Sequence, residues 1–120
     1  MPKRGDHAAP PPGPGEWDVV FETTDAARGW EELRRQAPGP LLEAWGQLRT
    51  DPRRRDRRQH PLKGSDLGVR KIGGQVLEQW QYEVTGGGRI WYCVDDDRTT
   101  VRLTWAGTGH PTRTNPSARG

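Results

Sequence analysis

Large aliphatic side chains and cysteine are both scarce in this sequence. Only 18 of its 120 residues are Leu, Ile, Val or Phe, a content low enough to raise the question of disorder. The single cysteine excludes a disulfide framework and a CxxC metal site. No apolar run approaches the roughly 18 residues that a membrane span needs, and no apolar segment follows Lys3 and Arg4 as it would in a signal peptide. We therefore expect a soluble, cytoplasmic protein with no membrane partner.

Tryptophan content and charge balance nevertheless argue for a folded domain. The six tryptophans supply a large buried area per residue, and a net charge of +3 is too small for self-repulsion to keep the chain unfolded. Residues 1–16 contain five prolines and three glycines, which predicts a disordered Pro/Gly-rich tail. We expect a single domain over residues 17–111 and a flexible C-terminal tail over residues 112–120.

Positive charge is concentrated in one segment, residues 49–71. Nine of the 19 Lys and Arg residues lie there against three aspartates, a local net charge of +6, and the rest of the chain sums to −3. A basic strip on a slightly acidic body is typical of proteins that bind polyanions. A solvated, arginine-rich surface loop without a partner explains the charge equally well.

The apolar spacing of the first half predicts a strand and then a helix hairpin. Residues 17–21 are rich in β-forming side chains, and residues 23–25 can cap a helix whose apolar positions recur every three or four residues up to Ala37. The Pro-Gly-Pro run at residues 38–40 forces a turn. A second helix with one apolar face follows over residues 41–51.

The second half alternates with the period of a strand. Strands are predicted over residues 75–84, 89–94 and 99–106, joined by a glycine turn and an aspartate turn. The middle strand is apolar throughout, which predicts a central strand covered on both faces. In the last strand Trp105 is expected to point inward, in alternation with Leu103. The result is an α+β fold: an N-terminal strand and an antiparallel helix hairpin packed on a small antiparallel β-sheet.

Three residues could together supply the base, the acid and the cation that RNA cleavage needs. His60 ends the basic segment, His110 follows the last strand, and Arg89 begins the central strand. In RNA transesterification a base takes the 2′-OH proton, an acid protonates the leaving 5′ oxygen, and a guanidinium can stabilise the charge that develops on the phosphate. Each histidine alone is more often an ordinary surface residue, so the assignment depends on whether the three side chains converge in space.

Four short motifs of the chain resemble those of a known family and occur in the same order. They are His60-Pro-Leu-Lys-Gly64, Trp80-Gln-Tyr-Glu-Val84, Gly88-Arg-Ile-Trp-Tyr92 and Gly109-His110. On these motifs residues 17–114 resemble the RelE/ParE superfamily of toxins from bacterial toxin–antitoxin pairs, and look closest to the YoeB and HigB branches of ribosome-dependent mRNA endonucleases. The resemblance implies a RelE-like fold and metal-independent cleavage of mRNA on the ribosome without a cofactor. It also implies inhibition by a small acidic antitoxin encoded by an adjacent gene.

The resemblance further implies roles for single residues. His60 stands where YoeB-type toxins have the glutamate proposed as general base, and His110 matches the general acid. Lys63 and Arg89 match the residues that contact phosphate. One strand departs from the family pattern, because it carries Glu83 and a glutamine where many relatives have Lys or Arg, and Glu83 is therefore an alternative base. RNA binding is then expected from the basic residues Arg53, Arg54, Arg55, Arg57, Arg58, Arg70 and Lys71.

Two other functions stay open. A ParE-like toxin has the same fold but inhibits DNA gyrase without RNA chemistry, and a non-catalytic RNA-binding domain needs neither histidine. The pair His60 and His110 favours the nuclease, because a gyrase inhibitor needs no acid–base pair. No metal site is expected, since the aspartates at 95–97 lack the pattern of a calcium loop. The tryptophans are expected mainly in the core, although one at the rim of the sheet could stack on RNA.

Overall fold

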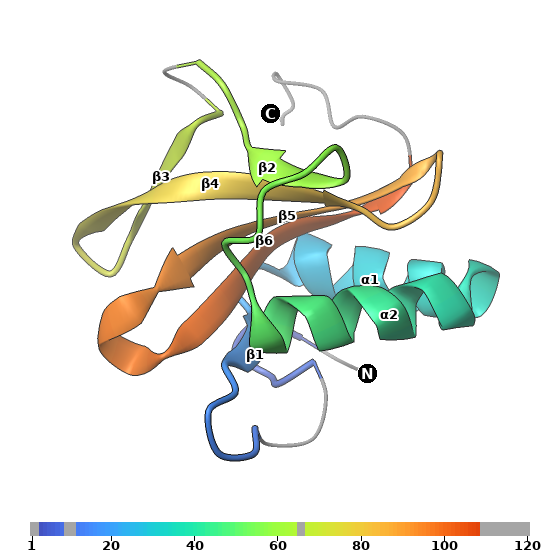
Figure 1. The fold of residues 1–120 in the computed structure, drawn as a ribbon, viewed down its shortest axis with the longest axis horizontal. Coiled ribbons are helices and arrows are strands. Elements are labelled where there is room, and N and C mark those ends of the chain that lie inside the picture. Colours follow the sequence, from blue (N-terminus) through green and yellow to red (C-terminus); the bar gives the residue numbers. More distant parts are fainter. Residues whose placement is uncertain (1–2, 9–11, 65–66, 109–120) are drawn as a thin grey trace.

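The computed structural model describes residues 3–8, 12–64 and 67–108. Figure 1 shows two helices side by side on one face of a six-stranded sheet, which confirms the expected α+β class. The elements in chain order are β1 (Asp18–Phe21), α1 (Thr24–Gln36), α2 (Pro38–Thr50), β2 (Gln59–Pro61), β3 (Val69–Ile72), β4 (Gln75–Glu83), β5 (Gly88–Asp95), a 3-10 turn (Asp96–Arg98) and β6 (Thr100–Thr108).

The sheet has the strand order β1-β6-β5-β4-β2, and β3 pairs with the other end of β4. β1 runs parallel to β6, whereas the other pairs are antiparallel. The meander predicted from the alternation, β4-β5-β6, forms the middle of this sheet. The sequence prediction missed β2 and β3, because three or four residues in a strongly charged segment show no clear alternation. The sheet is therefore wider than the expected three-stranded meander.

Local sequence determines where the two helices begin. The Thr23 side-chain oxygen accepts a hydrogen bond from the Ala26 N–H at 3.0 Å, which satisfies one free donor of the first turn of α1. α2 begins directly after Ala37 with Pro38 in its first turn, where the missing N–H costs nothing. The predicted helix hairpin is thus confirmed, but the Pro-Gly-Pro run forms the first turn of α2 and the connection is Ala37 alone.

α1 lies directly on the backbone of β6, and Gly29 permits this approach. A Cβ atom at position 29 would lie 1.6 Å from the carbonyl oxygen of Ala106. Any side chain at this position would therefore push the helix off the sheet. The contact fixes α1 over the end of β6, and the helix hairpin with it.

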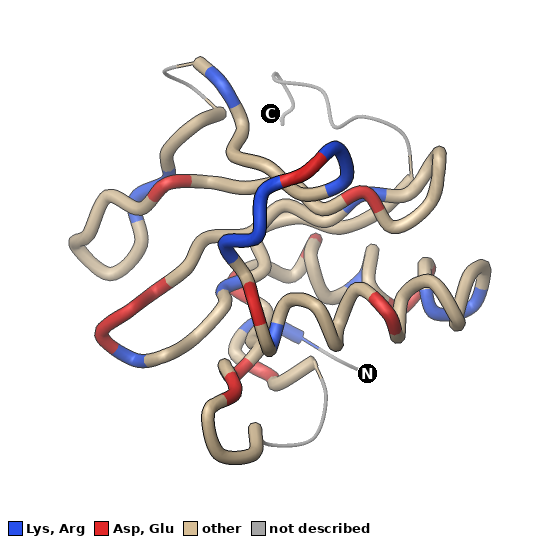
Figure 2. The backbone as a smooth tube through the Cα atoms, in the orientation of Figure 1, with Lys and Arg blue, Asp and Glu red and all other residues tan. Residues whose placement is uncertain are grey.

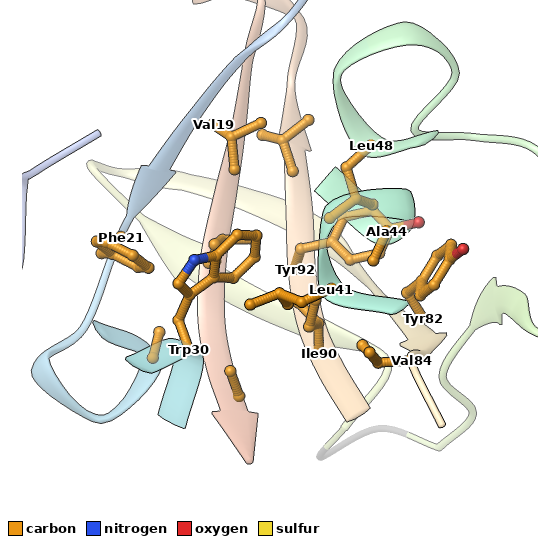
Figure 3. Packing of buried hydrophobic residues seen from close by; sticks show 14 of the residues in the cluster. Val19, Phe21, Trp30, Leu41, Ala44, Leu48, Tyr82, Val84, Ile90 and Tyr92 are labelled. Carbon is orange, nitrogen blue, oxygen red and sulfur yellow. The ribbon is translucent and has the colours of Figure 1, made fainter. Parts of the chain in front are cut away.

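The core lies between the helices and the sheet (Figure 3). Trp30 of α1 packs edge-on against Phe21 of β1 at a centroid distance of 5.9 Å, and Trp80 of β4 stacks on Tyr92 of β5 at 6.3 Å. The Tyr92 side chain is fully buried. Its hydroxyl donates to the carbonyl oxygen of Pro52 at 2.7 Å and accepts from the Gln59 amide at 3.0 Å. The loop between α2 and β2 is thereby attached to the centre of the core.

A β-bulge in β6 reverses the face to which Trp105 belongs. Trp105 pairs with Trp91, but the next pair along β5 is Tyr92 with Leu103, so Thr104 is an extra residue on β6. Leu103 is fully buried in the core as expected, whereas Trp105 lies on the opposite face of the sheet beside Trp91. The expectation that Trp105 points inward was wrong because the bulge breaks the alternation.

The N-terminal segment contacts the edge of β1. The N–H groups of Gly5 and Ala8 donate to the carbonyl oxygens of Phe21 and Val19, and the Phe21 N–H donates to Asp6. These residues fall within the predicted tail, of which residues 1–2 and 9–11 lie outside the described residues. The predicted C-terminal tail, residues 112–120, lies outside them as well, so the division into a domain and two tails stays a prediction.

Candidate functional site

The sheet has a second face, opposite the helices, which we call the open face. Four residues cross it at successive register positions of β2, β4, β5 and β6: His60, Gln81, Trp91 and Trp105. Directly opposed residues of paired strands share a face, and Trp91 lies between the core residues Ile90 and Tyr92 in sequence. These four side chains therefore belong to the face that the helices leave uncovered.

A second row on the open face contains Glu83 and Arg89, which are register partners on β4 and β5. Arg89 is in turn opposite Gly107 of β6. This row is two residues further along β4 than the row that contains His60. Strand spacing and rise place the Cα atoms of His60 and Arg89 about 12 Å apart. A histidine and an arginine side chain can both reach one phosphate group placed between these positions.

His60 lies next to a positively charged hollow beside β2. The hollow has a volume of about 570 Å³ and is lined by Arg55, Arg57, His60, Pro61, Lys63 and Glu78. We call it the basic hollow, because two arginines, one lysine and one histidine surround a single carboxylate. The concentration of positive charge favours a phosphate or another anion. The structure thus brings together four of the predicted site residues at one place.

The hydrogen bonding of His60 suits it to act as a base. Its Nδ1 lies 3.2 Å from the carbonyl oxygen of Pro61. A carbonyl oxygen only accepts hydrogen bonds, so this contact requires that Nδ1 carry the proton. In the neutral imidazole the lone pair then resides on Nε2. The side chain is half-buried, so Nε2 can receive a proton from a ligand on the surface.

Two other arginines of the loop between α2 and β2, Arg53 and Arg58, make hydrogen bonds to the protein itself. Figure 2 shows the dense positive charge of this loop. Arg53 makes two hydrogen bonds to the carboxylate of Asp96, at 2.9 and 2.7 Å, and this guanidinium holds the pKa of Asp96 below its usual range. Arg58 donates to the carbonyl oxygens of Glu83 and Val84 at 3.2 and 2.9 Å. These two arginines hold the loop in place.

The other predicted cations differ in their surroundings. Arg54 is exposed and pairs with Asp56 at 3.1 Å. Arg70 and Lys71 lie on β3 and line a separate hollow of about 410 Å³ together with Arg4 and Glu22. The structure therefore does not bring Arg70 and Lys71 into the basic hollow.

Cys93 lies on the open face of β5, near the segment 67–72. Its register partner on β4 is Gln79. The side-chain amide of Gln79 donates a hydrogen bond to the carbonyl oxygen of Leu67 at 2.8 Å. Burial raises the pKa of the Cys93 thiol to about 12, with the charge of Arg70 acting in the opposite direction. A thiol that stays protonated at neutral pH is a poor nucleophile. Cys93 thus acts as a small apolar residue of the interior.

His110, the predicted general acid, lies outside the described residues. The described part of the chain ends at Thr108, which pairs with Gly88, the residue before Arg89. Among the described residues, no three His, Cys, Asp or Glu side chains gather closely enough to hold a metal ion. Within the same part of the chain, neither helix is long and apolar enough to span a membrane.

Sequence reasoning missed Trp91 and Trp105 as surface residues of the site. Trp30 and Trp80 are buried as expected, but Trp91 and Trp105 are only half-buried. The uninterrupted apolar run of β5 predicted a strand covered on both faces, whereas the helices cover one. The position of Trp91 between two core residues was the signal that could have placed it on the open face.

No profile of a known protein family matches this sequence, and no curated protein is significantly similar to it. Solved structures do share its fold. A chain of the toxin–antitoxin complex RelBE2 from Mycobacterium tuberculosis is 26% identical, with a TM-score of 0.53 and an alignment that covers 78% of this chain and 98% of that one.

Two more distant structures have the same architecture. A toxin from Helicobacter pylori, described as metal-bound, is 15% identical over 75% of this chain and 91% of its own, with a TM-score of 0.54. A chain of the Escherichia coli DinJ-YafQ toxin–antitoxin complex is 16% identical over 77% and 91%, with a TM-score of 0.53. The fold is that of the RelE-like toxins, which confirms the resemblance seen in the sequence motifs. The closer relation to the YoeB and HigB branches stays a prediction.

Proposed function

We propose that this chain is the toxin of a toxin–antitoxin pair and that it cleaves mRNA on the ribosome in the cytoplasm. The observation that carries the proposal is the position of His60. This residue lies both on the open face with Arg89 and in the wall of the basic hollow. The fold that it shares with known toxins supports the same conclusion.

The proposed reaction is a transesterification without a metal ion. Nε2 of His60 takes the proton of the 2′-OH, and the 2′ oxygen attacks the adjacent phosphorus. The bond from phosphorus to the 5′ oxygen breaks, and that oxygen receives a proton from His110. The products are a 2′,3′-cyclic phosphate and a free 5′-OH. The guanidinium of Arg89 stabilises the negative charge that develops on the phosphate oxygens.

The basic hollow is proposed to hold the RNA backbone rather than to act in the chemical step. Arg55, Arg57 and Lys63 are exposed at its surface, where they can contact phosphates. Glu83 stays the alternative base, because it is the register partner of Arg89, whereas His60 is further away. Substitution of each residue alone distinguishes them, since only loss of the true base removes the chemical step.

An acidic antitoxin is the proposed protein partner. The local charge of +6 between residues 49 and 71 favours a partner of opposite sign. Such a protein would inhibit the enzyme by covering the basic hollow. Co-expression of the adjacent reading frame is expected to restore growth of cells that produce this chain, and failure of both rescue and co-purification would remove the support for a toxin–antitoxin pair.

Induction of the chain in cells followed by mapping of mRNA 5′ ends tests the proposed function. We expect new ends at defined positions within codons, which disappear in the His60→Ala and Arg89→Ala variants. Growth arrest with intact mRNA and a DNA-damage response would instead indicate a gyrase inhibitor of the ParE kind. Binding of RNA without new ends would indicate a non-catalytic RNA-binding domain.

A further inference from the structure

Two tryptophans meet on the open face, in the row that contains His60 and next to the row that contains Arg89. The ring centroids of Trp91 and Trp105 are 5.7 Å apart with their planes inclined by 53°. They come together only because the bulge at Thr104 turns Trp105 away from the core. Both rings are half-buried, although the helices lie on the other side of the sheet.

The orientation of each ring is fixed by its neighbours. The indole N–H of Trp91 donates to the side-chain oxygen of Gln81 at 2.9 Å, which links the ring to β4. The ring of Trp105 extends over Gly107, because a Cβ atom at that glycine would lie 3.1 Å from its Cζ2 atom. Gly107 is the register partner of Arg89, so the Trp105 ring lies beside the row that contains the arginine.

We propose that Trp91 and Trp105 form a stacking surface for a nucleobase of the RNA substrate. This inference rests on the proposed function and names how the substrate is positioned. Aromatic rings that are held in place on the open face and are only half-buried are suited to stacking, and every base has a π-face to offer. Arg89 on the neighbouring row and the cations of the basic hollow beside His60 make single-stranded nucleic acid the occupant whose charge fits.

The arrangement explains how a flexible strand could be held in register with the reacting groups. A base stacked on Trp105 places its own phosphate close to Arg89 on the neighbouring strand. The tryptophans are thus positioning residues, because they contact the base and not the reacting atoms. Since stacking does not read hydrogen-bond patterns, the surface is expected to tolerate all four bases.

The test measures binding of a fluorescent single-stranded RNA to the full chain in the His60→Ala background, which prevents cleavage. Trp105→Leu is expected to weaken binding about 5- to 150-fold at constant salt, the range found for loss of one stacked base. The slope of affinity against salt concentration should stay unchanged, because no cation is removed. Trp105→Phe should restore most of the affinity, which a role in folding alone would not predict.

Trp45→Leu is the matched control, because Trp45 is also half-buried but lies on α2, at the helical side. It should leave RNA affinity unchanged. A second measurement uses the protein with both tryptophans intact and an RNA in which single abasic sites are moved along the strand. An abasic site at one position of the RNA should weaken binding by the same factor as Trp105→Leu. This measurement does not depend on the folding of any tryptophan variant.

Equal affinities of the parent and the Trp105→Leu chain, or no sensitive abasic position, would overturn the stacking surface. That outcome is distinct from failure of the proposed function. A wild-type chain that cleaves mRNA while the tryptophan variants bind normally refutes only the stacking surface. A wild-type chain that never cleaves RNA, but binds it through Trp105, refutes only the nuclease.

Discussion

The hydroxyl of Tyr92 donates a hydrogen bond of 2.7 Å to the carbonyl oxygen of Pro52, across 40 residues of sequence. Tyr92 lies in the central strand, and Pro52 is a buried residue at the start of the loop that carries the basic residues. The same hydroxyl accepts from Gln59, directly before His60. The core therefore holds both ends of the basic loop at one point.

Substitution Tyr92→Phe should loosen this loop without opening a cavity. It removes the hydroxyl, so the Pro52 carbonyl oxygen loses its donor and the Gln59 side-chain amide loses one acceptor. We expect the free energy of unfolding to fall by about 1–3 kcal/mol, as measured by urea denaturation. The KM for RNA should rise because the basic hollow loses its fixed shape. Unchanged stability and unchanged KM would show that the hydrogen bonds do not position the loop.

The same residue predicts how stability depends on pH. Burial raises the pKa of Tyr92 above its ordinary value of 10.0. Above pH 10 the folded chain keeps the Tyr92 proton that the unfolded chain releases. The contribution of Tyr92 to the free energy of unfolding is therefore complete below pH 10 and is lost as the pH rises above it. Urea denaturation between pH 8 and pH 11 should show this loss, and a smaller one in Tyr92→Phe. Parallel curves for the two proteins would contradict the assignment.

Gly29→Ala should destabilise the chain even though alanine is the better helix former. The added Cβ atom meets the Ala106 carbonyl oxygen of β6, so α1 must move off the sheet. Gly46→Ala on α2 is the matched control, because no atom lies within 4 Å of a Cβ at that position. It should stabilise the protein by up to about 1 kcal/mol. Thermal denaturation of both variants checks the prediction, and equal shifts would contradict it.

Arg55 and Arg57 should carry the salt dependence of RNA binding. Replacing both with Gln removes two proposed phosphate contacts, so the slope of log affinity against log salt should flatten by about 1.4 for single-stranded RNA. Arg53→Gln removes a charge of the same loop that is already bound to Asp96. This control should leave the slope nearly unchanged. If all three substitutions act alike, net charge alone explains the binding and the basic hollow is a solvated surface.

The sequence predicted elements whose signal is local and missed those whose signal is not. Helical spacing and the Pro-Gly-Pro run predicted α1 and α2, and alternation predicted β4, β5 and β6 with ends that differ by one or two residues. β2 is three residues long and is stabilised by pairing with β4, about 20 residues later. No window of sequence contains that information. The bulge at Thr104 is equally hidden, because an extra residue is visible only against its partner strand.

The candidate site follows the same pattern. Residue types and motif order selected His60, Lys63 and Arg89 from the sequence, and the structure places Lys63 with His60 in one hollow. Which of the many arginines face that hollow depends on long-range partners: Asp96 engages Arg53 from 43 residues away. The pairing of Trp91 with Trp105 required the bulge. Charge and composition could therefore define a basic segment but not the side chains within it that are available to a ligand.

The central claim is that His60 acts as the base in metal-independent cleavage of RNA. Its most direct test is the rate of cleavage and the chemistry of the product ends for the purified chain acting on mRNA bound to ribosomes, compared with the His60→Ala chain. We expect products that end in a 2′,3′-cyclic phosphate and a rate that falls about 10²- to 10⁴-fold in the variant. Cleavage by His60→Ala at the parent rate, or products that end in a 3′-OH and a 5′-phosphate, would contradict the account.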